Sequence, residues 1–161
     1  MPDHAVTFDL DRLMSRLNPL VEWVLRSPLH PLLDRGLLMV RVTGRRTGRR
    51  YWIPVGYQHD GDTITVLVSK APRKQWWRNY RDPGPADVLL RGRTLHGRAH
   101  VVPAESTTFQ EAIERTLRRV PGLGRQFGIR YDRRAGLTPA QRRTVAANAV
   151  VVSIELDGTA D

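Results

Sequence analysis

The 161-residue chain contains no cysteine, which excludes disulfide bonds, thiolate metal sites and cysteine nucleophiles. Its five histidines are scattered, and this pattern predicts that no metal is bound. No apolar run approaches the roughly 18 residues of a membrane-spanning helix. The first residues also lack the basic start and apolar run of a secretion signal. We therefore expect a cytoplasmic protein.

Lysine is scarce as well, since only Lys70 and Lys74 occur among 26 basic residues and the rest are arginines. The net charge of +10 favours an anionic ligand or partner. An arginine bias can also reflect a GC-rich genome, so the charge by itself does not indicate nucleic-acid binding. A chain of this length fits one domain and can bury about 70% of its unfolded surface.

Residues 8–25 carry apolar side chains at steps of three and four, with charged side chains between them. This spacing predicts an amphipathic helix, bent at Pro19, and residues 1–35 are interpreted as this helix and a linker. Packing against its own domain is the simplest role for the helix. The alternatives are peripheral contact with a membrane surface and an interface in a homodimer.

Short extended segments follow the linker and predict a five-strand barrel core over residues 36–102. Asp60-Gly61 is a hairpin turn signal, and Arg91-Gly92-Arg93 is too short for a parallel crossover, so the strands are expected to be antiparallel. A sixth strand is predicted at residues 149–156. The five earlier strands are Leu37–Val42, Tyr51–Gln58, Thr63–Val68, Ala86–Leu90 and Thr94–Val102.

Residues 103–148 have helical patterns. Thr108 and Glu111 have the spacing of a capping box, and Pro121-Gly122 ends the helix that they begin. Residues 138–141 predict a second helix, with Thr138 as N-cap and a proline in the first turn, that ends near Asn148. The sequence therefore predicts one α+β domain over residues 1–161, a small antiparallel β-barrel of about six strands with flanking helices.

Four arginines surround two glycines in the turn Thr43–Arg50. Glycine permits a tight turn, and planar guanidinium groups bind oxyanions with two parallel hydrogen bonds. The turn therefore predicts a phosphate-bearing ligand. A solvent-exposed basic loop is the alternative.

A second polar cluster, residues 69–74, begins where the third strand ends, so the two clusters can converge on one anion. Trp76, Trp77 and Tyr80 follow among arginines. Aromatic faces beside cations suit a planar, phosphorylated heterocycle. The alternative is that a tryptophan of this segment packs in the core while the arginines face solvent.

Together, residues 43–49, Pro54, the hairpin at 60–62, Ser69-Lys70 and Trp77-Arg78-Asn79 resemble the deazaflavin-dependent nitroreductase family. Residues 20–102 carry this resemblance. It implies a split β-barrel of the flavin-reductase-like type that binds coenzyme F420. It also implies hydride transfer to a small electron-poor acceptor, such as a quinone, an enone or a nitro compound.

The resemblance also implies roles for individual residues. The arginine turn would hold the anionic F420 tail, Pro54 would line the ring pocket, and Ser69 with Lys70 would close around the phosphate. Tyr131 is the candidate substrate-binding residue, and no catalytic side chain is predicted because the cofactor supplies the hydride. The implied cofactor-binding residues are Arg45, Arg46, Thr47, Arg49, Arg50, Pro54, Ser69, Lys70, Trp77, Arg78 and Asn79.

One departure from the family pattern is Ala71-Pro72, where members usually have Gly-Gly. Proline lacks the N–H that could bind a phosphate, and Arg73 and Lys74 are expected to compensate by charge. FMN is the alternative cofactor because its ring and phosphorylated tail are similar. A protein without redox chemistry that binds an anionic or apolar ligand is a third reading. No nucleic acid is expected, because the basic residues are spread over helices and loops.

Overall fold

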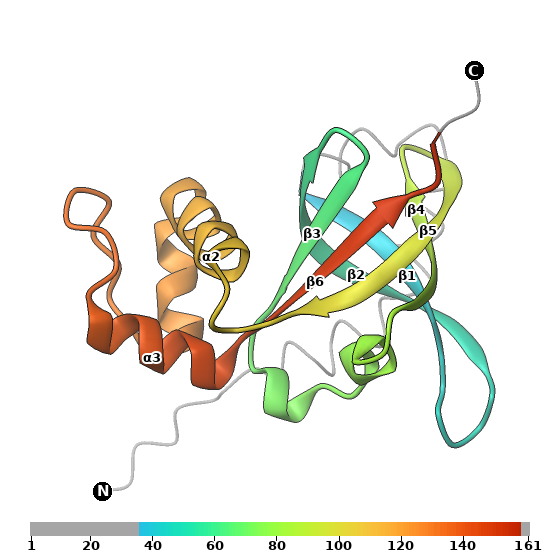
Figure 1. The fold of residues 1–161 in the computed structure, drawn as a ribbon, viewed down its shortest axis with the longest axis horizontal. Coiled ribbons are helices and arrows are strands. Elements are labelled where there is room, and N and C mark those ends of the chain that lie inside the picture. The colour runs from blue at the N-terminus through green and yellow to red at the C-terminus, as the bar shows by residue number, and fades with distance from the viewer. Residues whose placement is uncertain (1–35, 159–161) are drawn as a thin grey trace, which may run out of the picture.

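The computed structural model describes residues 36–158, so the predicted amphipathic helix at residues 8–25 lies outside the described residues. Six antiparallel strands close into a barrel in the order β1-β2-β3-β6-β5-β4 (Figure 1). The strands are β1 Leu37–Thr43, β2 Arg50–Asp60, β3 Thr63–Val68, β4 Gly84–Leu90, β5 Arg93–Val102 and β6 Val150–Leu156. The predicted α+β barrel of six strands is confirmed, and every strand boundary lies within two residues of the prediction.

Five helical segments complete the described chain. The short segments η2 Ala71–Arg73 and η3 Trp76–Tyr80 connect β3 to β4. The remaining three, α2 Thr107–Arg119, η4 Pro121–Phe127 and α3 Pro139–Asn148, lie between β5 and β6 and gather beside one end of the barrel (Figure 1). Among these described helices, none combines the length and the apolar character needed to cross a membrane.

The barrel is split between β2 and β3. These two strands pair only from Tyr57↔Val66 to Asp60↔Thr63, next to their hairpin. The part of β2 that precedes Tyr57 in the chain pairs with β1, and Pro54 pairs there with Met39. Proline has no N–H to donate and is tolerated at a free strand edge, so Pro54 is compatible with the parting of the two strands.

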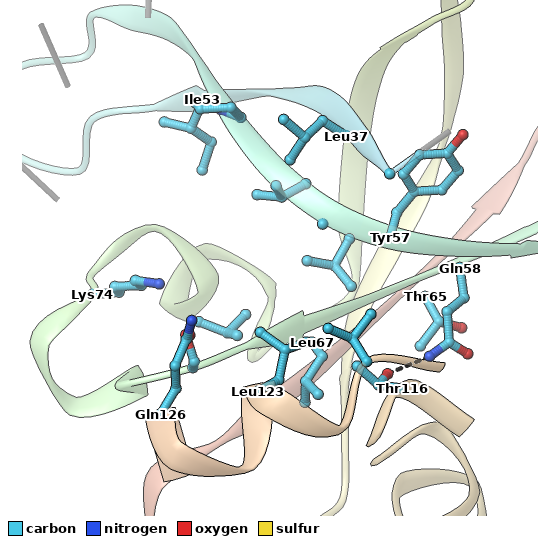
Figure 2. A pocket seen from close by; sticks show the side chains of 18 of the residues that line it. Leu37, Ile53, Tyr57, Gln58, Thr65, Leu67, Lys74, Thr116, Leu123 and Gln126 are labelled. Carbon is cyan, nitrogen blue, oxygen red and sulfur yellow. Dashed lines mark hydrogen bonds between the residues drawn. The ribbon is translucent and has the colours of Figure 1, made fainter. Parts of the chain in front are cut away.

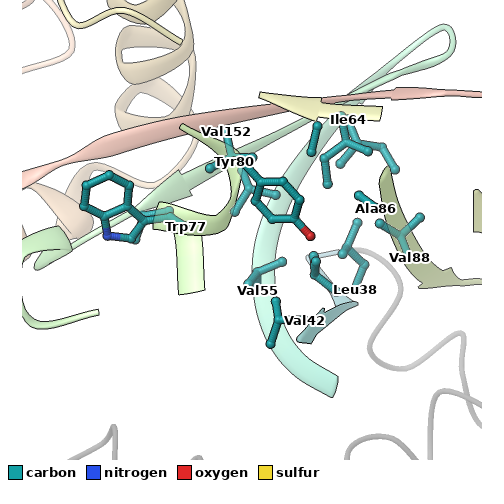
Figure 3. Close-up of a cluster of buried hydrophobic side chains, with 14 of the residues drawn as sticks. Leu38, Val42, Val55, Ile64, Trp77, Tyr80, Ala86, Val88 and Val152 are labelled. Carbon is teal, nitrogen blue, oxygen red and sulfur yellow. The ribbon is translucent and has the colours of Figure 1, made fainter. Parts of the chain in front are cut away.

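Two hydrophobic clusters hold the elements together. One fills the barrel and includes Leu38, Val88, Val152 and Ile154, as expected for side chains that alternate along the strands (Figure 3). The other packs α2, η4 and α3 against the outside of the barrel. Its most buried members are Phe109, Ile113, Leu117, Phe127, Val145 and Val151.

The start of α2 corrects the predicted capping box. Ser106 is the N-cap, and its hydroxyl accepts a hydrogen bond from the backbone N–H of Phe109 at 3.2 Å. Thr108 lies inside the first turn, because Phe109 occupies the third helical position and packs in the second cluster. The predicted cap of α3 is confirmed, with reciprocal hydrogen bonds between Thr138 and Gln141.

Tyr80 is buried in the barrel cluster, where Figure 3 shows its ring among aliphatic side chains. Burial, with a contribution from the Asp87 charge, raises the pKa of Tyr80 from its ordinary 10.0 to about 12. The neutral hydroxyl therefore contributes stability that is present below pH 10 and lost as the pH rises towards 12.

We expect the free energy of unfolding to fall by about 1.4 kcal/mol per pH unit through this range. A Tyr80→Phe variant should lose this part of the fall. Urea unfolding of both proteins at pH values from 9 to about 12 measures the difference. Parallel profiles for the two proteins would contradict the assignment.

Candidate functional site

A cavity of about 710 Å³ lies where β2 and β3 separate (Figure 2). Residues 53–58 of β2 and residues 65–69 at the end of β3 line one side. The last turn of α2 and η4 line the other through Thr116, Val120, Leu123 and Phe127. The volume lies within the roughly 300–1,000 Å³ of small-molecule sites, and the walls are mostly apolar.

The two ends of this cavity differ in chemistry. Lys74 and Gln126 lie at one end in Figure 2, and Arg73 and Ser69 also line the cavity. Gln58, Thr65 and Thr116 lie at the other end. The arrangement suits a ligand with an apolar body and an anionic group.

The segment η2 determines how this cationic end can contact an anion. The backbone N–H of Arg73 donates to Lys70 at 3.0 Å, and that of Lys74 donates to Ala71 at 3.0 Å. Pro72 has no N–H, and the Ala71 carbonyl accepts the indole N–H of Trp77 at 2.9 Å. The Arg73 and Lys74 backbone N–H groups are therefore already engaged, which leaves the side chains of these two residues as donors for an anion.

The two adjacent tryptophans have different environments. Trp77 is 9% exposed, belongs to the barrel cluster and has the guanidinium groups of Arg78 and Arg81 at 5.6 and 5.2 Å from its ring centre. Trp76 lines the cavity and makes an edge-on contact with Tyr80. The structure thus brings Trp76 to the cavity, whereas the resemblance had selected Trp77.

The arginine turn projects from the barrel on the side away from α2 and α3 (Figure 1). Its shape is set by Gly48, which has a φ of 63°, and by a hydrogen bond from the Gly44 N–H to Arg49 at 2.7 Å. Asn79 of η3 donates to the Thr43 carbonyl at 3.0 Å, which ties the base of the turn to η3. Arg45, Arg46, Thr47, Arg49 and Arg50 are all exposed and do not line the cavity.

The other predicted site residues are distributed as follows. Pro54 and Ser69 line the cavity, whereas Lys70, Arg78 and Asn79 do not. Tyr131, the candidate substrate residue, packs against the second hydrophobic cluster away from the cavity lining, and its hydroxyl is buried with no partner among the described residues. Its substrate role remains a prediction that the packing does not favour.

Sequence reasoning missed most of the cavity wall. Arg73, Lys74 and Trp76 had been recognised as cations and an aromatic next to the site, so their proximity could be found from the sequence. Thr65 and Leu67 alternate with the buried side chains of β3, so this alternation could have indicated that they point out of the barrel. No sequence signal connects Thr116, Val120 or Leu123 to the cavity, because they reach it only after α2 packs against the barrel.

A charged network lies elsewhere on the barrel. The Arg41 guanidinium donates to the Asp87 carboxylate, His96 Nδ1 lies 2.6 Å from the same carboxylate, and Arg41 lies over the Trp52 ring at 5.5 Å. Desolvation raises the pKa of Asp87, but the contacts with His96 and Arg41 outweigh it and leave the pKa below its ordinary value. None of these residues lines the cavity, and the network joins β1, β4 and β5.

Comparisons with known proteins indicate the family to which the chain belongs. A family model described as F420H(2)-dependent quinone reductase matches residues 29–128. No curated protein matches the chain.

Solved structures similar to this chain share its fold at low sequence identity. HutZ, the heme storage protein from Vibrio cholerae, is 11% identical over 88% of this chain and 91% of that chain, with a TM-score of 0.52. The F420-H2 dependent reductase FDR-A is 16% identical over 76% of this chain and 96% of that chain, with a TM-score of 0.51. A domain-swapped dimer is 14% identical over 91% of this chain and 98% of that chain, with a TM-score of 0.55.

Proposed function

Because the chain belongs to the F420H(2)-dependent quinone reductase family and is an F420-dependent oxidoreductase, we propose that its cavity holds the deazaflavin ring. This is the cavity between β2, β3, α2 and η4. Its cationic end would hold the phosphate of the tail. The observation that supports this proposal most directly is a cavity with mostly apolar walls that has Trp76, Arg73 and Lys74 among its lining residues.

The residues present fit such a cofactor. The apolar walls match a planar ring system, and the volume of about 710 Å³ is sufficient for a ligand of this class. Ser69, Arg73 and Lys74 provide a hydroxyl and two cations for a phosphate. When bound, reduced F420 supplies a hydride. The protein then contributes orientation, exclusion of water and compensation of the tail's negative charge.

We propose a quinone as the acceptor, in agreement with the name of the family. Enones and nitro compounds are the further acceptors with the same electron-poor character. The apolar side chains of Leu67, Val120 and Leu123 would contact such a flat, apolar molecule. No side chain is assigned a covalent role.

The exposed arginine turn would bind the outer part of the anionic tail. The link between Asn79 and Thr43 places η3 between the cavity and the turn, so a tail leaving the cationic end can follow η3 outward. In this arrangement the exposed arginines of the turn attract the anionic tail electrostatically across water, and Arg73 and Lys74 act at the cavity itself. The arginines of the turn are Arg45, Arg46, Arg49 and Arg50. Trp77 and Arg78 would support η3 through their mutual packing.

FMN is the second candidate cofactor, because the same cavity and cations suit any phosphorylated planar ring. We also propose that residues 1–161 form one domain and that the chain is a homodimer. The similar structure described as a domain-swapped dimer supports the second of these proposals.

Titration with F420 and FMN side by side tests the cofactor. We expect F420 to bind at least about tenfold more tightly than FMN, a difference of about 1.4 kcal/mol. Reduced F420 should then be oxidised when a quinone is added. Fluorescence of the deazaflavin measures the binding, and its absorbance measures the turnover. Tight FMN binding without measurable F420 binding would reverse the assignment.

A further inference from the structure

The cavity is expected to narrow towards the hairpin of β2 and β3, because the two strands are paired there. β2 and β3 are held together beside their hairpin, where Gln58 pairs with Thr65, and they part towards Pro54 and Ser69. Gln58, Thr65 and Thr116 line this end, and Figure 2 shows their side chains close together. A ring bound at this end would have residues of both β2 and α2 beside it.

A side-chain hydrogen-bond network connects β2 to α2 at this end of the cavity. The Gln58 amide Nε2 donates to the Ala112 carbonyl at 3.2 Å and also to the Thr116 hydroxyl. The Thr116 hydroxyl donates to the same carbonyl at 2.8 Å. Because a carbonyl only accepts, the network requires the amide nitrogen, not its oxygen, to face α2.

A second polar link between this region of the barrel and α2 is weak. Arg115 and Asp60 are 4.0 Å apart, with side chains that are 57% and 84% exposed. Exposed ion pairs of this kind contribute little. The Gln58 network is therefore a stronger polar restraint on this edge of the cavity than the Arg115–Asp60 pair.

Gln58 is not the residue that protein stability alone would favour at this position. Its Oε1 atom is buried and has no hydrogen-bond partner among the described residues. A buried acceptor without a partner is unfavourable, and an apolar side chain of similar size would avoid it. A local violation of this kind is expected where a residue serves function.

On these grounds we infer that Gln58 is a positioning residue: through Thr116 and the Ala112 carbonyl it holds α2 against β2 and keeps the cavity narrow enough to select flat acceptors. This inference rests on the proposed function of the cavity. Phe109, Ile113 and Leu117 are almost fully buried and anchor the same helix in the second cluster. Loss of the network should therefore widen the cavity without unfolding α2.

The test compares Gln58→Met and Thr116→Val with Thr116→Ser as the matched control. The first two remove a donor or an acceptor at nearly constant volume, whereas serine keeps the hydroxyl. Two quinones serve as probes, 2,6-dimethyl-1,4-benzoquinone, which is flat, and 2,6-di-tert-butyl-1,4-benzoquinone, which is thick. Equilibrium dialysis without F420 measures their binding, and kcat and KM are then measured with reduced F420.

We expect the wild type and Thr116→Ser to favour the flat quinone by about tenfold or more. Gln58→Met and Thr116→Val should reduce this preference to about threefold or less, by tighter binding and a lower KM for the thick quinone at similar kcat. The melting temperature should stay close to that of the wild type, because the second cluster still anchors α2. Faster amide hydrogen exchange in residues 112–119 should accompany the change.

An unchanged preference in both Gln58→Met and Thr116→Val would overturn the inference, and so would an equal loss in Thr116→Ser. Failure of the wild type to bind F420 would instead refute the proposed function. The two failures are distinguishable, because the quinone preference is measured in the absence of F420.

Discussion

Replacing Arg73 and Lys74 together by alanine is expected to weaken F420 binding by about 3 kcal/mol, or roughly 100-fold. Both side chains line the cavity, and the backbone N–H groups of these two residues are already used inside η2. The side chains are then the main donors that this segment can offer to a phosphate. Charge-assisted hydrogen bonds contribute about 1.5–3 kcal/mol each, and exposure of Arg73 keeps the total near the lower end.

Two further double variants make this prediction specific. Arg93→Ala with Arg143→Ala removes the same charge from exposed positions outside the cavity and should leave F420 affinity nearly unchanged. Arg45→Ala with Arg46→Ala should cost about 1 kcal/mol, and salt should reduce this loss, because exposed charges are screened. Fluorescence titration at low and high salt measures all three. A larger loss from the arginine turn than from Arg73 and Lys74 would place the phosphate on the turn instead.

Replacing Gly97 by alanine is expected to destabilise the barrel by about 3 kcal/mol or more, because a small-to-large change at a tightly packed site forces the backbone to shift. A Cβ atom at this position would lie 2.3 Å from the Glu155 carbonyl oxygen and 2.9 Å from the Leu156 Cα. Both are backbone atoms of β6, which pairs with β5 through Gly97↔Leu156. The strands could accept the methyl group only by separating at this β5–β6 pairing.

Gly122→Ala is the matched control for this variant. A Cβ atom there has nothing within 4 Å, and Gly122 has no positive φ. Its free energy of unfolding should stay within about 0.5 kcal/mol of the wild type. Urea unfolding followed by tryptophan fluorescence compares the three proteins. Equal stability of the two variants would show that β5 and β6 can separate locally at little cost.

Much of the fold could be read from local patterns. The Asp-Gly hairpin and the cap of α3 each depend on residues close together in sequence, and the structure confirms both. The start of α2 was predicted incorrectly because Thr108 and Glu111 have the same spacing as a real capping box. Packing of Phe109 in the second cluster selected Ser106 instead.

The sequence by itself determined the six strands and the concentration of cations before and after β2 and β3. It also carried the resemblance to an F420-dependent family, which the family match confirms. These properties follow from residue type and short-range spacing, which act before distant parts of the chain meet.

Only the tertiary structure decided which of these residues line the cavity. Trp76 rather than Trp77 reaches it, because the Trp77 indole is bonded to Ala71 and buried in the barrel cluster. The end beside the hairpin depends on Gln58 and Thr116, which are 58 residues apart in the chain. Whether a side chain at such a position faces the cavity depends on how η3 and α2 pack on the barrel. That packing depends on contacts between distant residues that no local pattern specifies.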